Sequence, residues 1–108
     1  MQADFSPTSD ALSDQPSGYV YVLGTLTPRG VRTYVGWTLD PARRLDQHNA
    51  GTGAKSTRGQ QWCLLYVERH ESRTAAMSRE WHLKRDRRFR SALARAHSAG
   101  EPARSSLP

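Results

Sequence analysis

Two short aromatic segments constrain the fold of this chain more than any other feature. They are Tyr19-Val20-Tyr21-Val22-Leu23 and Tyr34-Val35-Gly36, and a turn sequence with Pro and Gly separates them. β-Branched and aromatic residues on both sides of such a turn predict a hairpin, with strands over 18–24 and 31–37. If Thr25 pairs with Gly30, Tyr21 lies opposite Tyr34, and opposed residues share a face of the sheet. The hairpin is therefore expected to present both hydroxyl groups on one side.

The rest of the chain predicts a small mixed domain. Asp40-Pro41 is a helix start, with an N-cap Asp and Pro in the first position, and this helix is expected to end near Asn49. A third strand over 62–68 follows, then a helix capped by Ser72, and a basic stretch that leads into a last helix ending near His97. The predicted fold is α/β (α+β), a small three-stranded, mainly antiparallel sheet flanked by helices in the order β-β-α-β-α-α. We expect a disordered leader over 1–17, one domain over 18–97 and a flexible tail over 98–108.

The charge of the chain favours a polyanionic partner. The 108 residues carry a net charge of +6, and the three charged residues before Gly18 are all aspartates, so residues 18–108 hold 16 basic and 7 acidic residues, a net +9. Nucleic acid is the expected partner of such a body, with an anionic membrane surface as the second choice and a solvated surface without a partner as the third. No apolar run approaches the length of a membrane span, and no signal peptide is visible.

Cysteine usage fits a reducing compartment. Cys63 is the only cysteine, so no intrachain disulfide can form. It lies in the apolar run Trp62-Cys63-Leu64-Leu65, which predicts that the thiol is buried. We therefore expect a cytoplasmic protein.

Arg44 and His48 stand four residues apart on the predicted helix and therefore lie on one face. The turn after the second strand would return this helix to the side of the hairpin. An arginine is suited to the extra negative charge of a pentacoordinate phosphate, although a solvated helix charge is the alternative. His48 ordinarily titrates near neutral pH, which suits a general base or a phosphate donor. A histidine held by the helix dipole is the equally weighted alternative.

Glu80 lies in the middle of the helix that Ser72 begins, among alanine and methionine neighbours that predict contact with the sheet. A carboxylate in such surroundings needs a partner, and a metal ion, Arg79 and Lys84 are the candidates. Mg²⁺ commonly takes one or two protein carboxylates together with substrate phosphate. No Cys/His cluster has zinc spacing.

The tyrosines have two interpretations. A phenol is a poor base at neutral pH because its ordinary pKa is about 10. A nearby arginine or metal ion would lower that pKa and make the hydroxyl useful in catalysis. Alternatively, Tyr19, Tyr21 and Tyr34 are core aromatics whose hydroxyl groups reach the surface.

The sequence Gly51-Thr52-Gly53-Ala54-Lys55-Ser56-Thr57 has a superficial likeness to a phosphate-binding loop. The G-x-x-x-x-G-K-[ST] spacing fails because Ala54 precedes Lys55, and the segment follows a helix rather than a strand. We interpret residues 50–61 as a flexible basic loop, with Lys55 and Arg58 available to contact backbone phosphate. No nucleotide cofactor is expected.

Taken in order, these motifs resemble those of the GIY-YIG nuclease domain, especially its small single-domain bacterial members of the YhbQ type. Tyr19-Val20-Tyr21 is similar to the first motif and Tyr34-Val35-Gly36 to the second. The segment from Arg44 to Gly51 matches the family's R-L-x-x-H-N-x-G pattern. Thr57-Arg58-Gly59 and the helix with Ala75, Ala76 and Glu80 follow in the same order, so that the resemblance covers residues 18 to 93.

The resemblance implies a metal-dependent endonuclease, a hydrolase acting on the phosphodiester bonds of DNA, with Mg²⁺ or Mn²⁺ as cofactor and a role in DNA repair or processing. It makes Glu80 the metal ligand and Arg44 the residue that stabilises the transition state. Tyr21 and Tyr34 match the motif tyrosines, one of which is often the general base, and His48 matches a histidine found in some branches.

Three positions depart from the family pattern. Tyr19 replaces the glycine of the first motif, Trp37 stands where the excision-repair nucleases carry a lysine, and Asp86 interrupts the basic run near the C-terminus. The last departure affects the expected substrate contacts of the C-terminal helices. No second domain for targeting is expected, so the resemblance constrains the choice of substrate poorly.

The expected protein is therefore a small, monomeric DNA endonuclease, with branched, single-stranded and damaged DNA as candidate substrates. A non-catalytic, basic nucleic-acid-binding module is the alternative, and a basic adaptor for a protein partner is a third interpretation. The expected catalytic residues are Tyr21, Tyr34, Arg44, His48 and Glu80, and the expected backbone contacts are Lys55, Arg58, Lys84, Arg87 and Arg88.

Overall fold

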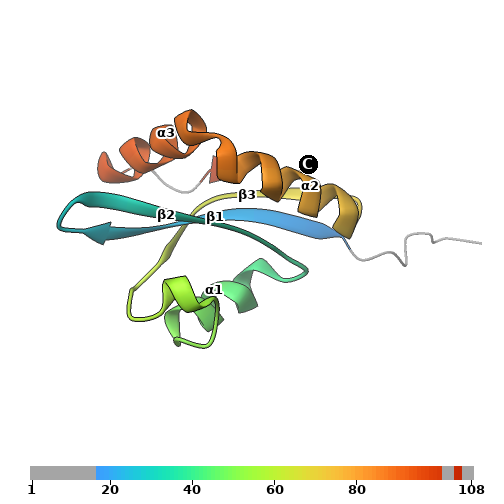
Figure 1. The fold of residues 1–108 in the computed structure, drawn as a ribbon, viewed down its shortest axis with the longest axis horizontal. Helices are drawn as coiled ribbons and strands as arrows, with labels where there is room; N and C mark the ends of the chain where they lie inside the picture. Colours follow the sequence, from blue (N-terminus) through green and yellow to red (C-terminus); the bar gives the residue numbers. More distant parts are fainter. Residues whose placement is uncertain (1–16, 101–103, 106–108) are drawn as a thin grey trace, which may run out of the picture.

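A computed structural model describes residues 17–100 and 104–105 of the chain. Helix α1 covers one face of a twisted sheet, and α2 and α3 cover the other face (Figure 1). Strand β1 is antiparallel to both β2 and β3, and β4 is added parallel to β3, giving the order β2-β1-β3-β4. The elements are β1 (Gly18–Thr27), β2 (Gly30–Thr38), α1 (Pro41–Asn49), the 3₁₀ helix η2 (Lys55–Thr57), β3 (Cys63–His70), α2 (Arg73–Arg85), α3 (Arg87–Ser98) and β4 (Arg104–Ser105).

The predicted α+β fold is confirmed, including the antiparallel sheet of the first three strands and the order of the elements. The predicted leader lies outside the described residues, apart from Ser17. Within the stretch predicted as a tail, the structure describes the end of α3 and the short strand β4. None of the described helices is both long and apolar enough to span a membrane.

The hairpin of β1 and β2 is longer than predicted. Both strands continue to Thr27 and Gly30, so that only Pro28 and Arg29 form the turn. Pro fixes the φ angle that its position in the turn needs. Gly30 has a φ of +111°, a conformation that favours glycine. The hydroxyl of Thr27 donates to the carbonyl of Gly30 at 2.7 Å and closes the turn.

This longer hairpin shifts the register by two residues. Tyr21 lies opposite Gly36, and Leu23 lies opposite Tyr34, so the expected pairing of Tyr21 with Tyr34 is wrong. Because side chains alternate between the two faces of a strand, a shift by two leaves each of them on its expected face. The rings of Tyr21 and Tyr34 therefore still share a face, with centroids 6.3 Å apart.

An apolar core fills each side of the sheet. The larger core lies under α2 and α3, and it fixes these helices on the sheet. The smaller core lies under α1, and it contains the tyrosines of the two motifs. The buried members of the larger core are Val20, Val22, Val35, Leu65, Tyr66, Ala76, Leu83 and Leu93; those of the smaller are Tyr21, Leu23 and Trp62, with Tyr34, Leu45 and Leu64 packed against them.

Cys63 is exposed rather than buried as predicted. It is the first residue of β3, and side chains alternate along a strand, so its neighbours take the core positions. Trp62 is 3% exposed and belongs to the core under α1. The apolar run therefore supplies the core without the thiol.

Polar side chains define where the helices begin. Asp40 and Ser72 cap α1 and α2 as predicted, each accepting a hydrogen bond from a backbone N–H of the first turn. Asp86 caps α3 in the same way, by accepting from the backbone N–H of Phe89 at 3.0 Å. The residue that interrupts the basic run is therefore the start signal of α3, and Arg87 is the first residue of that helix.

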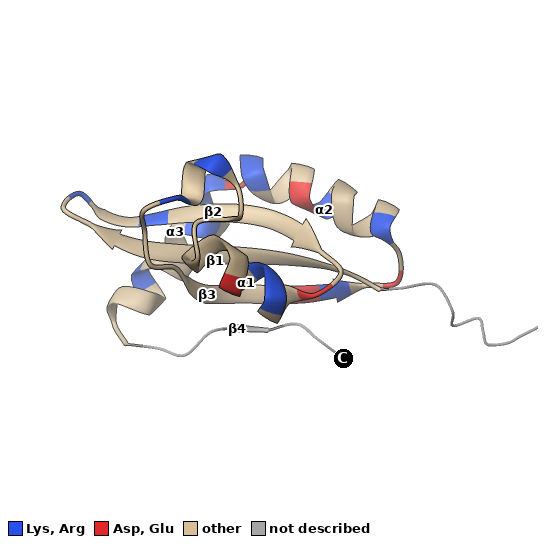
Figure 2. Ribbon diagram, turned by 90° about the horizontal axis from the view of Figure 1, so that it is seen from below, with Lys and Arg blue, Asp and Glu red and all other residues tan. Residues whose placement is uncertain are grey.

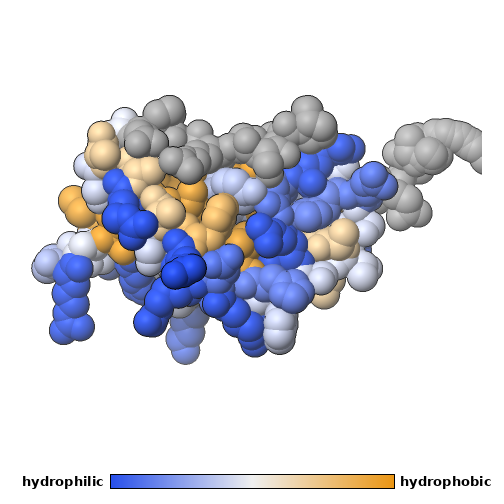
Figure 3. Space-filling view, turned by 90° about the horizontal axis from the view of Figure 1, so that it is seen from above, coloured by the Kyte–Doolittle hydropathy of each residue, from blue (hydrophilic) through white to orange (hydrophobic). Residues whose placement is uncertain are grey.

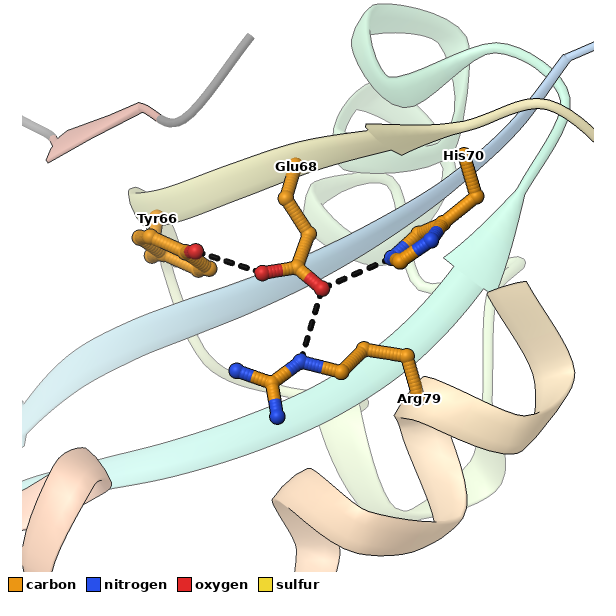
Figure 4. A network of polar contacts seen from close by, with 4 residues as sticks. All are labelled: Tyr66, Glu68, His70 and Arg79. Carbon is orange, nitrogen blue, oxygen red and sulfur yellow. Dashed lines mark hydrogen bonds and ion pairs between the residues drawn. The ribbon is translucent and has the colours of Figure 1, made fainter. Parts of the chain in front are cut away.

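Glu68 joins β3 to α2 through a network that the sequence did not indicate (Figure 4). Its carboxylate accepts a short hydrogen bond from the Tyr66 hydroxyl, lies 2.7 Å from Nε2 of His70, and accepts from Nε of Arg79 at 2.7 Å. Burial alone would raise the pKa of Glu68, but these three hydrogen bonds outweigh it and lower that pKa. Arg79 is thereby bound to Glu68 rather than to Glu80.

Candidate active site

A chain of buried hydrogen bonds runs under α1. Tyr21 is 2% exposed, and its hydroxyl lies 2.9 Å from Nε2 of His48, whose ring is fully buried. The other ring nitrogen of His48, Nδ1, lies 2.7 Å from Oγ1 of Thr57. Thr57 in turn donates to the carbonyl of Ala54 at 2.8 Å. His48 is in the last turn of α1, where the helix dipole also favours it, and the structure adds two hydrogen-bond partners to its buried ring.

The hydroxyl of Thr57 fixes the tautomer of His48. A hydroxyl group has one proton, and Thr57 gives that proton to Ala54. Towards Nδ1 of His48, Oγ1 of Thr57 can therefore only accept, which assigns the imidazole proton to Nδ1. The Nε2 atom then has a free lone pair and accepts a hydrogen bond from the hydroxyl of Tyr21.

Burial sets the protonation state of both groups. It raises the pKa of Tyr21 to about 12, because its effect exceeds the opposing effect of the neighbouring Arg44 guanidinium. Burial, followed by the positive charge of Arg44, lowers the pKa of His48. At neutral pH Tyr21 is therefore protonated and His48 is neutral. Arg44 lowers the pKa of Tyr21, as expected, but burial raises it by more, so the net shift is upward.

Two glycines make room for these side chains. Gly36 is the last residue of the second motif, and a Cβ atom there would overlap the Tyr21 hydroxyl. A Cβ atom on Gly53 would lie 2.6 Å from Nδ1 of His48. The ring of Tyr34 packs beside the pair, with its centroid 4.9 Å from that of His48. Tyr34 therefore forms part of the wall around the Tyr21–His48 hydrogen bond.

Arg44 lies beside this pair on α1, one turn before His48. Its Nη1 atom donates to Oε1 of Gln47 at 2.9 Å. Its charge acts on both Tyr21 and His48. An open cavity of about 420 Å³ adjoins it, and an anionic group could enter there. The residues that line this cavity are Trp37, Thr38, Leu39, Asp40, Arg43, Arg44 and Gln47.

Glu80 approaches the site from α2. Its side chain is 21% exposed, and Oε2 lies 3.3 Å from Nζ of Lys84, one turn later on the helix. The negative charge of Glu80 contributes to the raised pKa of Tyr21, as the smallest of five influences. The structure therefore brings Tyr21, Tyr34, Arg44 and His48 together, and it places Glu80 within electrostatic reach of them. Of the partners expected for Glu80 within the chain, Lys84 is the one observed.

Comparison with known proteins agrees with this arrangement. The profile of the GIY-YIG catalytic domain matches residues 17–92. This chain belongs to the GIY-YIG family. Uncharacterised-family (UPF0213) proteins are among its relatives: one from Natronomonas pharaonis is 43% identical over 67 residues, covering 61% of this chain and 75% of the relative. One from Clostridium perfringens is 40% identical over 68 residues, covering 62% and 70%. No solved structure gives a significant match.

The GIY-YIG domain makes this chain a nuclease that acts on DNA. Its first motif contributes Tyr21, its second motif contributes Tyr34 and Gly36, and its helix motif contributes Arg44 and His48. All five residues lie around the small core under α1, or on the helix that covers it. The family motifs, which are far apart in the sequence, therefore meet at one place in the fold.

The donor groups of this GIY-YIG domain fit a metal ion only if the substrate completes the site. Among the described residues, no group of three His, Cys, Asp or Glu side chains could hold a metal ion. Zinc sites need three or four such ligands, so the donor set does not fit zinc. Mg²⁺ and similar hard cations keep several waters and use one or two carboxylates with substrate phosphate. The partly exposed carboxylate of Glu80 fits that requirement.

The loop that joins α1 to β3, which its composition suggested to be flexible, is held by hydrogen bonds at two positions in the structure. Thr57 is fully buried, and its carbonyl accepts from Nε1 of Trp62 at 2.9 Å. Nη2 of Arg32 donates to the carbonyl of Ser56 at 3.1 Å. The loop therefore holds the exposed side chains of Lys55 and Arg58 beside the buried Thr57 that orients His48.

The predicted backbone contacts lie on one side of the molecule. Lys84, Arg87 and Arg88 are exposed around the junction of α2 and α3. Figure 2 shows basic segments of this junction and of the loop after α1 along the same edge of the sheet, beside β2, although they lie on opposite faces of the sheet (Figure 1). Since β2 is an edge strand, these basic groups border an edge of the sheet.

Proposed function

We propose that this GIY-YIG domain is a divalent-metal-dependent endonuclease that hydrolyses phosphodiester bonds in DNA, in repair or processing. The observation that carries the proposal is the hydrogen bond from the Tyr21 hydroxyl to Nε2 of His48. It pairs a motif tyrosine with a buried, neutral proton acceptor, which a purely structural tyrosine does not need.

The pKa of Tyr21 determines how the two residues share the work. With a pKa of about 12, Tyr21 is not a phenolate at neutral pH and cannot begin the reaction as a base. It can instead pass a proton on: its oxygen accepts a proton from the attacking water while its own proton moves to Nε2 of His48. The water oxygen bonds to phosphorus, the bond from phosphorus to the leaving oxygen breaks, and that oxygen takes a proton from solvent.

Arg44 and Glu80 supply the charges that this reaction needs. The guanidinium of Arg44 lines an open cavity, and it would hold the oxygens of the phosphate as their negative charge increases. Glu80 would hold Mg²⁺ or Mn²⁺ together with the substrate phosphate, and the ion when bound supplies Lewis acidity and a template for the reacting groups. Lys84 would then release Glu80 and become available for a DNA phosphate.

A cleavage assay tests the proposal. Supercoiled, single-stranded and branched DNA are incubated with the protein in Mg²⁺, in Mn²⁺ and in EDTA. We expect metal-dependent cleavage that Glu80→Gln abolishes. Glu71→Gln is the matched control, because Glu71 is an exposed carboxylate just before α2. Cleavage that is absent on all substrates, or that persists undiminished in Glu80→Gln, would refute the proposal.

The ion pair between Glu80 and Lys84 favours one alternative function, a basic module that binds nucleic acid without cutting it. In such a module the lysine would neutralise Glu80 permanently. Binding would then fall with salt, as phosphate contacts require, while Glu80→Gln would leave it unchanged or strengthen it. The absence of cleavage together with this pattern would identify the alternative.

A further inference from the structure

A second cavity lies at the other end of β2, on the side of the sheet that α3 covers. It has a volume of about 200 Å³. Two arginines contribute to its wall, Arg87 and Arg90, and no acidic side chain does. The complete lining is Val31, Thr33, Arg87, Arg90, Ser91 and Ala94.

The two arginines of this cavity lack a counter-charge. In the part of the chain that the structure describes, neither belongs to an ion pair. The nearby carboxylate of Asp86 accepts the capping hydrogen bond of α3. Arg87 and Arg90 stand three residues apart on that helix, a spacing at which like charges repel. An anion in the cavity would relieve this repulsion.

Arg90 also has an unmet hydrogen bond. Its Nε atom is buried and has no hydrogen-bond partner among the described residues. Such orphan donors are unfavourable and call for an explanation in each case. A guanidinium binds phosphate through two parallel N–H groups, and Nε is one of the usual pair. A small rotation of the Arg90 side chain would aim this N–H into the cavity.

The position of the cavity indicates which anion it takes. Strand β2 forms one wall through Val31 and Thr33, and four residues beyond Thr33 its Trp37 lines the cavity beside Arg44. Four residues of a strand span about 14 Å, which equals the rise of about four base pairs along the axis of a DNA duplex. Figure 3 shows many hydrophilic side chains on the face of the molecule that α2 and α3 cover. The two cavities therefore both border β2, one near each end of the strand.

We propose that Arg87 and Arg90 form a phosphate subsite that binds the DNA backbone about four base pairs along the duplex axis from the bond facing Arg44. Ser91 and Thr33 offer hydroxyl groups for the remaining phosphate oxygens. This subsite rests on the proposed function insofar as DNA is the substrate, but it requires no cleavage.

Its test is the salt dependence of DNA binding, measured in EDTA with a fluorescent duplex so that no cleavage occurs. Log affinity falls as log salt rises, and in the variant Arg87→Gln/Arg90→Gln this fall should be less steep. The magnitude of the slope should decrease by about one, which corresponds to the loss of one phosphate contact. The fall in affinity between about 50 and about 200 mM salt should then be about 3-fold smaller than in the unmodified protein. Arg95→Gln is the matched control, an exposed arginine of the same helix outside the cavity, and it should leave the slope unchanged.

A second measurement keeps the result interpretable if a variant is poorly folded. The Nε–H resonance of Arg90 in the unmodified protein should shift when the duplex is added, and Arg90→Lys, which keeps the charge but lacks the fork, should bind DNA less tightly. Equal slopes for the double variant and Arg95→Gln would overturn the subsite. If the Arg90 resonance shifts with inorganic phosphate but not with DNA, the cavity binds small anions only, and the DNA subsite is likewise overturned. A protein that shows the reduced slope but never cuts DNA would support the subsite and refute the proposed hydrolysis.

Discussion

At the scale of single residues, Thr57 decides what His48 can do, although it touches no reacting atom. Its hydroxyl accepts from Nδ1 of His48 and leaves Nε2 free to accept from Tyr21. Thr57→Val removes that acceptor, so the tautomer with a proton on Nε2 gains population. We expect kcat to fall by about 10- to 100-fold at a nearly unchanged KM for DNA, since this removes part of the usual contribution of acid–base catalysis.

Thr57→Ser is the conservative control for this substitution, because it keeps the hydroxyl, and most of the activity should return. Nitrogen NMR of His48 reports the tautomer directly and should find the proton on Nδ1 in both the unmodified protein and Thr57→Ser. An equal loss of activity in the serine and valine variants, with the tautomer unaltered, would contradict the assigned role.

The pair of Tyr21 and His48 should control the pH dependence of cleavage. The pKa of His48 is lowered from its ordinary value of 6.5, so His48 remains a neutral acceptor as the pH falls below 6.5. The rate should therefore persist below pH 6.5 and fall only at more acid pH, as His48 becomes protonated. Tyr21→Phe and His48→Gln should each lower kcat by about 10²- to 10⁴-fold, and the double variant should lose little more.

Tyr19→Phe provides the control for that series, since Tyr19 is the other tyrosine of the first motif and makes no contact with His48. It should cut DNA at the normal rate. The residual cleavage rate of His48→Gln should lose the fall at acid pH. If that fall remains at the same pH, a group other than His48 is responsible for it.

The motifs alone identified Tyr21, Tyr34, Arg44 and His48 as neighbours, because their spacing places them on one hairpin and one helix. They could not identify Thr57 as the partner of His48, since that contact depends on how the loop after α1 folds back. They indicated that Arg44 lowers the pKa of Tyr21, but not that the net shift is upward. An arginine is visible in a sequence, whereas the burial that outweighs it at Tyr21 results from packing under α1.

At the scale of elements, the Glu68 network should add a polar attachment of α2 to the apolar core beneath it. Glu68 is 7% exposed and receives hydrogen bonds from Tyr66 and Arg79. Glu68→Gln should lower the free energy of unfolding by about 1–3 kcal/mol at neutral pH. Because the pKa of Glu68 is below 4.5 in the folded protein, the stabilisation is complete above pH 4.5 and is lost as the pH falls through the lowered value.

Urea unfolding at a series of pH values measures this effect. The difference between the unmodified protein and Glu68→Gln should shrink below pH 4.5, while Glu71→Gln, the exposed neighbour on the same connection, should differ little at any pH. A difference that is constant with pH would mean that the charge of Glu68 is not the stabilising feature.

Helix starts were readable from the sequence, whereas the contacts between elements were not. Asp40 and Ser72 act on their own first turns, so local chemistry decides them. The hairpin register depended on whether the strands continue to Thr27 and Gly30, and turn residues alone do not settle that. The partner of Arg79 is Glu68, eleven residues earlier and on another element, and helical spacing had suggested only near neighbours such as Glu80.

At the scale of the whole molecule, the net charge of +9 over residues 18–108 indicated DNA, but it did not show where DNA lies. The fold places basic groups along the β2 edge (Figure 2), and we propose that DNA binds there. The loop after α1 is expected to hold DNA without taking part in the chemistry, because Lys55 and Arg58 are exposed while the buried Thr57 between them orients His48.

Lys55→Ala/Arg58→Ala should therefore separate binding from catalysis. Loss of two phosphate contacts should decrease the magnitude of the slope of log affinity against log salt by about two. The fall in affinity between about 50 and about 200 mM salt should then be about 10-fold smaller than in the unmodified protein. The value of kcat at saturating DNA should not change, since neither residue contacts Tyr21, Arg44 or His48. Arg95→Ala, an exposed arginine on α3, is again the control for charge alone. A lowered kcat at saturation would show that the loop acts on His48 through Thr57 rather than only on the backbone, and an unchanged slope would place the DNA away from this loop.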